Sequence, residues 1–404
     1  MKIIHTADWH IGKILHRQDL YEDISFFFDW LVEYIKSENI DLLLVSGDIF
    51  DLANPSNRDT RLYYQMLYKL SLTDTKVIIT GGNHDSISLL DAPSALLDVL
   101  NIHIISGARQ IISEELIPYY DKNKTLQCVI LAVPFLRDKD LRSAVQASEI
   151  GDKSAQTSAA IKNHYDQLVL EARNIYGPNV PLIAMGHLFV HGSLTSDGER
   201  EIHVGNLEGL EAKIIPSEIS YMALGHIHKP QRIAKKDHIR YSGSPVFLDF
   251  SEREYEKMII KIELDNHSIQ NIQQVMIPKV RDILKKAGSL AEIKHFIETY
   301  SKTYPLQTLL ELEICEPKMD ITIIHEAEDM LQSFESDDLK ILKHKFSFGN
   351  TEKADKIFLT ESRSIEELTP IDILNKKLEE TNMDTEQKKV LVSAYNMILE
   401  SLND

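Results

Sequence analysis

The stretch DLLLVSGDIFD, residues 41–51, joins an apolar run to two carboxylates. Its leucines and valine form the short, continuous apolar segment that is typical of a strand buried on both faces. Gly47 and Asp48 follow directly, and Asp51 comes three residues later. Because a glycine permits a sharp change of direction, the stretch predicts a buried strand whose end presents acidic side chains.

Five other segments of the first half have the same texture and read as buried strands. They are KII (2–4), KVIIT (76–80), VILAV (129–133), LIAM (182–185) and YMAL (221–224). Two amphipathic helices are predicted between strands, at residues 21–38 and 58–72. Alternation of strands and helices indicates a layered α/β domain.

Residues of the types that bind metals follow the ends of four of these strands as well. They are Asp8 and His10, Asn83, His84 and Asp85, His187, and His226 and His228. Strand ends of α/β sheets face a common crevice, and carboxylates and imidazoles bind first-row divalent ions. One such cluster occurs by chance in many chains, but five in this order predict a metal site. Asp51 either orients a ligand or caps the following helix.

Composition limits the class of protein. The net charge of −18 argues against nucleic-acid or membrane binding through overall charge, but not against a local site whose metal ions supply positive charge. Two distant cysteines predict no disulfide framework. We find no signal peptide and no apolar run of about 18 residues, so we expect a cytoplasmic protein with no membrane contact.

The texture of the chain changes after residue 274. VRDILKKAG (280–288) and LAEIKHFIETY (290–300) read as short helices, LQTLLELEI (306–314) as a strand and HEAEDMLQSF (325–334) as a helix. We therefore expect a domain at 1–274, a small α+β domain at 275–348 and a polar linker at 349–367.

The tail, residues 368–404, carries two helix signals. Thr369 with Pro370 opens one helix and Asp384 with Gln387 opens the other. Each helix has one apolar stripe, which docks either on the body of the protein or on a partner helix.

The order of the five clusters resembles that of the calcineurin-like metallophosphoesterase superfamily. The resemblance implies a four-layer β-sandwich flanked by helices, with two metal ions at its edge. One ion would take Asp8, His10, Asp48 and His228. The other would take Asp48, Asn83, His187 and His226. Asp48 would bridge them, since a carboxylate offers about four lone-pair sites.

Two ions about 3.5–4 Å apart can activate water and clamp a phosphoryl oxygen. In this hypothesis His84 stabilises or protonates the leaving oxygen. Asp85 accepts a hydrogen bond from the other ring nitrogen of His84 and fixes its tautomer. Asp85 could instead cap the helix that follows.

Further stretches narrow the resemblance to the SbcD family of nucleases. They are ADWHIG (7–12), SGDIFD (46–51), GHLFV (186–190), SDGERE (196–201), ALGHIHKPQ (223–231) and YSGSP (241–245). The resemblance is strong over residues 1–250 and rests on layout alone over 275–404. It implies a manganese-dependent hydrolase that acts on DNA in repair, recombination and replication. The implied activities are 3′→5′ exonuclease on duplexes and endonuclease on single strands and hairpins.

The same resemblance implies partners. An SbcC-type coiled-coil ABC ATPase would bind the tail and gate access of DNA, residues 275–348 would cap the DNA, and two copies of the chain would form a homodimer within a heterotetramer. Candidate phosphate contacts are Lys13, Arg17 and Arg58, and more distantly Lys229 and Arg232. The alternative enzyme is a metallophosphoesterase acting on a nucleotide or other small phosphodiester, and a scaffold without metal is a third possibility.

Overall fold

The structure is a computed structural model that describes residues 1–142, 153–190, 193–194, 211–265 and 267–349. One compact unit comprises Met1–Ile314 and Thr322–Lys345. The other comprises Cys315–Ile321 and Phe346–Asp404, most of which lies outside the described residues. The predicted tail helices, nearly all of the predicted linker and the SDGERE stretch also lie outside them. Within the described ranges no helix is long and apolar enough to cross a bilayer.

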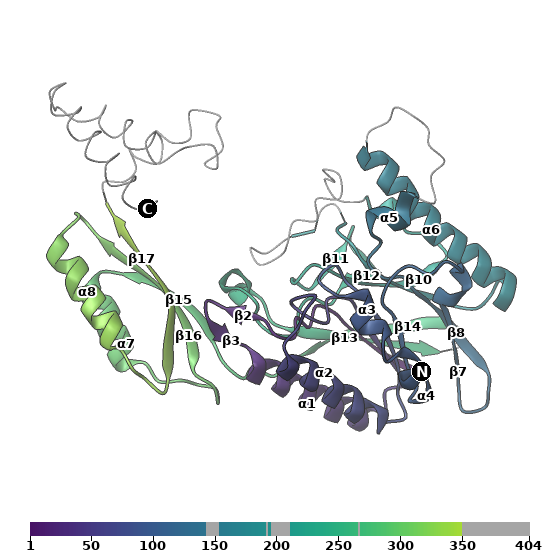
Figure 1. The fold of residues 1–404 in the computed structure, drawn as a ribbon, viewed down its shortest axis with the longest axis horizontal. Coiled ribbons are helices and arrows are strands. Elements are labelled where there is room, and N and C mark those ends of the chain that lie inside the picture. The colour runs from purple at the N-terminus through teal and green to yellow at the C-terminus, as the bar shows by residue number, and fades with distance from the viewer. Residues whose placement is uncertain (143–152, 191–192, 195–210, 266, 350–404) are drawn as a thin grey trace, which may run out of the picture. The chain divides into compact units, whose positions relative to one another are not determined.

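Two six-stranded mixed sheets form the centre of the first unit (Figure 1). The first has the order β14 (Ser268–Met276), β13 (Met258–Asp265), β1 (Lys2–Thr6), β4 (Leu42–Ser46), β5 (Lys76–Thr80) and β6 (Ile102–Ile105). The second has the order β11 (Gln231–Ile233), β12 (Lys236–Tyr241), β10 (Ile219–Gly225), β9 (Leu182–His187), β8 (Leu126–Ala132) and β7 (Leu116–Tyr120). A two-stranded ribbon, β2 (Ile14–Leu15) with β3 (Gln18–Asp19), precedes the first helix.

Parallel pairing aligns the strand ends that carry the predicted ligands. β1, β4 and β5 run parallel in the first sheet, and β9 and β10 run parallel in the second. Their carboxyl ends therefore lie together at one edge of each sheet.

Successive residues of the central strands face two different apolar cores. Ile3, Leu42 and Leu44 lie in the core between the two sheets, where Ile130 and Met185 of the second sheet meet them. Their sequence neighbours, such as Leu43, face the core beneath the helices of the first sheet instead. Because successive strand residues point to opposite faces, a continuous apolar run satisfies both cores at once.

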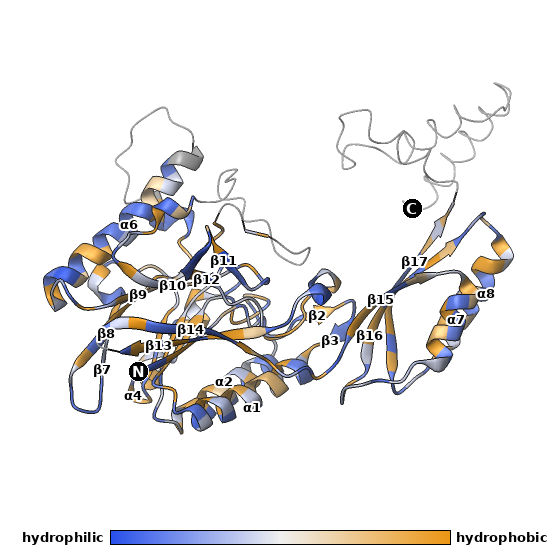
Figure 2. Cartoon of the chain, turned by 180° about the vertical axis from the view of Figure 1, so that it is seen from behind, coloured by the Kyte–Doolittle hydropathy of each residue, from blue (hydrophilic) through white to orange (hydrophobic). Residues whose placement is uncertain are grey.

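Helices complete the outer layers. The first sheet is covered by α1 (Tyr21–Glu38) and α2 (Asn57–Ser71), and the short α3 (Ile87–Asp91) and α4 (Ser94–Val99) follow β5. The second sheet is covered by α6 (Lys153–Tyr176), which α5 (Asp138–Arg142) precedes. Figure 2 shows both polar and apolar residues on the visible side of α6, where Leu170 and Ile175 are exposed. The layers are helix, sheet, sheet and helix, so the predicted α/β fold and four-layer sandwich are confirmed.

A smaller sheet follows, with the order β15 (Ile283–Gly288), β16 (Thr308–Glu316) and β17 (Leu339–Phe348). It carries α7 (Leu290–Thr299) and α8 (Ile321–Ser333). A buried, two-pronged ion pair anchors the segment that leads into it, because Arg281 Nε and Nη2 donate to the carboxylate of Asp23 on α1 at 2.7 and 2.8 Å.

The prediction of a helix at 280–288 is wrong. Residues 283–288 form β15, which pairs in parallel with β16 from Ile283 opposite Leu309 onward. The helix begins only after Ser289, whose side chain and Glu292 form a reciprocal capping box. Pairing with a neighbouring strand overrides the high helical propensity of the lysine and alanine residues here, because tertiary context outweighs propensity.

Candidate metal centre

The five strand ends converge where the two sheets meet. Asp8 N donates to Gly47 O at 3.0 Å, which joins the loop after β1 to the loop after β4. His10 N donates to Asp48 O at 3.0 Å and makes a second link. Ser46 Oγ donates to a backbone oxygen of β10 at 3.0 Å, which ties the first sheet to the second. Residues from distant parts of the chain are therefore fixed side by side.

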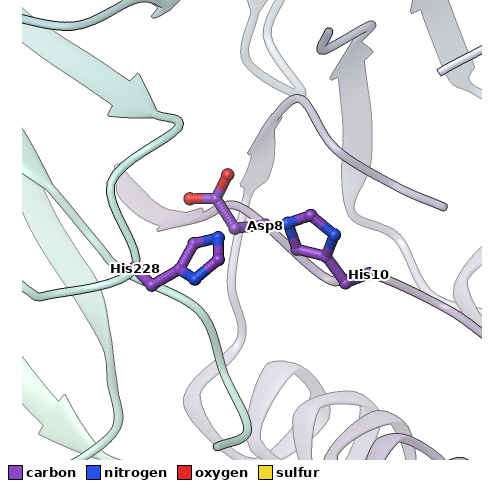
Figure 3. Close-up of side chains that lie close together, drawn as sticks. All are labelled: Asp8, His10 and His228. Atoms are coloured by element: carbon purple, nitrogen blue, oxygen red, sulfur yellow. The ribbon is translucent and has the colours of Figure 1, made fainter. Parts of the chain in front are cut away.

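Three groups of buried side chains each bring ligand atoms within 4.8 Å of one another. They are Asp8, His10 and His228; His10, Asp48 and His84; and Asp48, His187 and His226. Figure 3 shows the rings of His10 and His228 gathered beside the Asp8 side chain. The groups overlap through His10 and Asp48, so they form one continuous cluster rather than three separate sites.

Unpartnered polar atoms lie in the first part of the cluster, which comprises Asp8, His10 and His228. Asp8 Oδ2 and His10 Nε2 are buried and have no hydrogen-bond partner among the described residues. The other oxygen of Asp8 accepts a hydrogen bond from His226 N at 2.8 Å. Burying a carboxylate oxygen and a ring nitrogen without partners is costly, and a divalent cation between them would satisfy both atoms.

The second part of the cluster comprises Asp48, His187 and His226, and here oxygen acceptors lie close to a histidine ring. His187 Nε2 lies 2.9 Å from Asn83 Oδ1 and 3.2 Å from Asp48 Oδ2. His187 Nδ1 lies 2.9 Å from Ser46 O, which can only accept, so we assign a proton to Nδ1. The Nε2 lone pair of the neutral ring then faces two oxygen acceptors, an arrangement that fits a bound cation.

Without a metal ion, Nε2 of His187 binds a proton instead. Burial acts to lower the pKa of His187, but the charge of Asp48 and its hydrogen bond outweigh burial and raise that pKa to about 9. Burial and the Asp48 charge raise the pKa of Asp8 to about 7. Burial lowers the pKa of His226 well below its usual value, which keeps this ring neutral and able to act as a ligand.

Asp48 stands between the two parts. Its Oδ2 lies 3.2 Å from His187 Nε2 and 3.6 Å from His10 Nε2. Its Oδ1 accepts a hydrogen bond from His84 N at 2.9 Å. Although burial acts to raise the pKa of Asp48, the surrounding histidines hold it well below its usual value. One ionised carboxylate thus faces ligand atoms of both parts.

Asp51 orients one of the predicted ligands. Its Oδ1 lies 3.1 Å from His10 Nδ1, which leaves His10 Nε2 directed into the cluster. Burial acts to raise the pKa of Asp51, but His10 and then Lys13 lower it to about 2. The alternative role as a helix cap does not apply, because Ser56 caps α2.

Glu252 is a residue that sequence reasoning missed. It is fully buried, and its Oε1 lies 2.9 Å from Nδ1 of His228. Burial acts to raise its pKa, but Lys257 and His228 lower it to about 2. Its neighbours in FSEREYEK offer other acidic residues and no diagnostic spacing, so nothing in the sequence singled it out.

His84 belongs to the cluster, but its predicted partner is wrong. His84 Nδ1 lies 2.7 Å from the backbone oxygen of Asp51, not beside Asp85. The Asp85 carboxylate accepts backbone N–H groups instead, from Gly82 at 2.8 Å, Phe50 at 3.0 Å and Ile49 at 3.1 Å. Asp85 therefore joins the loops after β4 and β5. It does not cap α3 either, because Ser86 does.

Four ligand candidates have a backbone conformation that is uncommon for non-glycine residues. The φ angles are 54° for Asp8, 45° for His10, 50° for Asp48 and 98° for His226. Such conformations cost about 1–3 kcal/mol each and are retained mainly where surrounding structure enforces them, often at functional sites. Their concentration here is independent support for a site.

The predicted phosphate contacts differ in their surroundings. Lys13 Nζ lies 3.3 Å from Asp51 Oδ1 and so borders the cluster. Arg58 pairs with Asp19 and covers the Tyr21 ring. Arg17 is exposed in the turn between β2 and β3. Of the two distant candidates, Arg232 pairs with Asp237 and Lys229 lies over the Tyr255 ring.

Comparison with known proteins finds a family whose model matches more than half of the chain. Residues 1–230 match the family model described as calcineurin-like phosphoesterase. This range contains all seven predicted ligands and both predicted catalytic residues.

Curated relatives are the SbcD proteins of the nuclease SbcCD from several bacteria. The chain is 28% identical to that of Escherichia coli strain K12 over all of this chain and 98% of the relative. It is 36% identical to that of Rhodobacter capsulatus over 65% of this chain and 66% of the relative. It is 29% identical to that of Bacillus subtilis over 74% of this chain and 75% of the relative.

Proposed function

Because the chain belongs to the calcineurin-like phosphoesterase family, we propose that it is a metal-dependent DNA nuclease, the nuclease component of an SbcCD-type complex. The observation that carries the proposal is Asp48, whose Oδ2 lies 3.2 Å from His187 Nε2 and 3.6 Å from His10 Nε2. A carboxylate between two sets of ligand atoms can hold two ions close together, as in two-metal phosphodiester hydrolysis. Relatives named as nucleases match the whole chain, which favours DNA over a nucleotide or small phosphodiester.

The predicted ligands divide into two ion positions. One comprises Asp8, His10, His228 and Asp48, and the other comprises Asp48, Asn83, His187 and His226. When bound, two divalent ions activate a water molecule and stabilise charge on the phosphoryl group. We propose manganese because the resemblance to the SbcD family implies it; the oxygen and nitrogen ligands themselves bind several first-row divalent ions.

His84 acts on the substrate. The carbonyl of Asp51 accepts a hydrogen bond from Nδ1, so that nitrogen carries a proton. His84 Nε2 points back to the cluster, 4.0 Å from Asp48 Oδ2. In its doubly protonated form, His84 donates from Nε2 to the leaving oxygen. Asp85 keeps this loop and the loop of Asp48 in register, so it is a positioning residue.

A substrate comparison tests the proposal. Purified chain with Mn²⁺ is given a linear duplex labelled at its 5′ ends and, separately, a chromogenic phosphodiester. We expect a ladder of shortened labelled strands, as a 3′→5′ exonuclease produces, and cleavage of single-stranded and hairpin DNA. Cleavage of the chromogenic substrate with intact DNA would instead favour the small-substrate enzyme.

Assembly follows from the same proposal. An SbcC-type coiled-coil ABC ATPase binds residues 368–404, and residues 275–348 cap the DNA. The complex works in the cytoplasm, where free thiols such as those of Cys128 and Cys315 persist. Deleting residues 368–404 should abolish binding of the ATPase and leave Mn²⁺ binding intact. Loss of both would place the tail within the fold of the nuclease.

The outer side of α2 supports a homodimer. Tyr64, Tyr68 and Leu72 recur every four residues and are 38%, 64% and 67% exposed. Contiguous exposed apolar surface can serve as a protein–protein contact, and we take the contact here to be with a second copy of the chain. We expect Tyr68→Glu to convert the dimer to a monomer in light scattering, whereas Tyr120→Glu, at another exposed tyrosine, leaves the mass unchanged. Equal masses for both variants would remove α2 from the interface.

A further inference from the structure

The stretch YSGSP, residues 241–245, lies directly against the loop of the metal ligand His228. Ser244 N donates to His228 O at 3.1 Å. Gly243 has a φ of 75°, and a Cβ atom there would lie 2.5 Å from the same oxygen. Only glycine permits this approach, so the stretch holds the backbone on which His228 stands.

The side chain of His228 is held by Glu252. The Glu252 carboxylate is fully buried, and its Oε1 lies 2.9 Å from His228 Nδ1. Its Oε2 accepts hydrogen bonds from Leu248 N at 3.1 Å and Ser244 Oγ at 3.3 Å. These contacts fix the carboxylate in one orientation.

Lys257 provides the matching positive charge. Its side chain is 5% exposed and pairs with Glu252 Oε2. Its Nζ also donates to Ser244 Oγ at 2.7 Å and lies 4.9 Å from the centre of the Tyr255 ring. A buried carboxylate is tolerated when it is paired and fully hydrogen-bonded, so Lys257 lets Glu252 remain charged next to His228.

Three of the predicted ligand histidines have their rings oriented by different kinds of partner. His187 Nδ1 faces a neutral backbone oxygen, and His10 faces Asp51, which is 16% exposed. His228 faces a carboxylate that is wholly buried and has its own buried cation. A carboxylate partner on a ligand histidine fixes the ring and increases its basicity, and losing such a partner typically weakens metal binding 10–100-fold.

We propose that Glu252 and Lys257 are positioning residues for His228, and that this buried pair determines the affinity of the ion bound by Asp8, His10 and His228. With Nδ1–H donated to Glu252, the Nε2 lone pair of His228 faces the other two ligands, whose ligand atoms lie within 4.8 Å. The inference rests on the proposed two-metal function. It predicts that the pair acts on one ion position and leaves the other, around His187 and His226, intact.

Manganese binding by the full-length chain tests the inference. The variant Glu252→Gln keeps the size of the side chain and removes its charge. Glu254→Gln is the matched control, since Glu254 lies on the same 3-10 helix and its side chain is 74% exposed. Calorimetry gives the affinity of each ion, and electron paramagnetic resonance reports whether two Mn²⁺ ions are close enough to couple.

We expect two ions and a coupled spectrum for the wild type and for Glu254→Gln. Glu252→Gln should bind one ion normally and the other roughly 10–100-fold more weakly, with the six-line signal of an isolated Mn²⁺ at intermediate loading. Wild-type affinities at both positions in Glu252→Gln would overturn the inference. A wild-type chain that binds no Mn²⁺ would overturn the proposed function with it.

Loss of folding needs a separate control, because Glu252→Gln leaves Lys257 buried without its carboxylate. The double variant Glu252→Gln/Lys257→Met removes both charges and keeps the length of the lysine stem. We expect it to melt near the wild-type temperature when free of metal and to retain the weakened ion position. Recovery of wild-type affinity in this folded double variant would show that the carboxylate is not needed and would overturn the inference.

Discussion

His84 and its neighbour Asp85 show how adjacent residues take different tasks. The His84 ring lies in the cluster with its Nδ1 bound to a backbone oxygen, whereas the Asp85 carboxylate binds three backbone N–H groups. We expect His84→Gln to lower DNA cleavage by about 100-fold or more, the range for losing a general acid. Both Mn²⁺ ions should remain bound in elemental analysis. Loss of one ion would make His84 a ligand instead.

Protons and metal ions compete for the same atoms. The pKa of the metal-free His187 is raised to about 9. At pH 7.5 its ring therefore carries a second proton, on Nε2, which metal binding must displace. We expect release of about one proton at this position and an affinity that rises about tenfold per pH unit up to pH 9. Calorimetry in two buffers of different ionisation enthalpy measures the release. Its absence at pH 7.5 would contradict the assignment of His187 as a ligand.

Individual site residues could be predicted from the sequence where a motif includes them. They could not be predicted where only packing in the folded protein brings them to the site. Asp8, His10 and Asp48 stand at fixed offsets from strand ends, and the structure brings them together as expected. The partner of the His84 ring is a main-chain oxygen, which no side-chain pattern encodes. Glu252 acquires its role from the fold of the 3-10 helix, so its sequence could not distinguish it from nearby Glu254.

Among elements, the strand ends depend on glycines that admit close neighbours. A Cβ at Gly82 would lie 2.1 Å from Asp48 Oδ1 and 2.3 Å from Asp48 N. We expect Gly82→Ala to displace Asp48, to lower the free energy of unfolding by about 1–3 kcal/mol and to abolish Mn²⁺ binding.

The control for this variant is Gly349→Ala, where the nearest atom would be 3.3 Å away. Urea unfolding and calorimetry of both variants give the comparison. If Gly82→Ala bound both ions as the wild type does, the close packing of the two loops would not be needed for the site.

Elements were predictable in proportion to how fully they are buried. β4 and β5 are covered on both faces, so their continuous apolar runs could be recognised from the sequence. In contrast β15 is covered on one face only, and Lys285 and Ala287 are its exposed residues. Its alternating pattern is short and rich in helix-forming residues, and only its pairing with β16 reveals it as a strand.

At the scale of the molecule, the charge of −18 has a local explanation. The site concentrates Asp8, Asp48, Asp51 and Asp85 near the position where a phosphodiester would lie, and so repels it. Two divalent ions would reverse the local charge and provide the attraction that the surface lacks. On this account DNA binding near the site should depend on the metal more strongly than on the half-buried Lys229.

The central claim is that Asp48 is shared by two ions, and anomalous diffraction at the manganese edge tests it most directly. Crystals of the full-length chain soaked in Mn²⁺ should show two peaks about 3.5–4 Å apart, one on each side of the Asp48 carboxylate. A single peak, or two peaks of which one is out of reach of Asp48, would contradict the account.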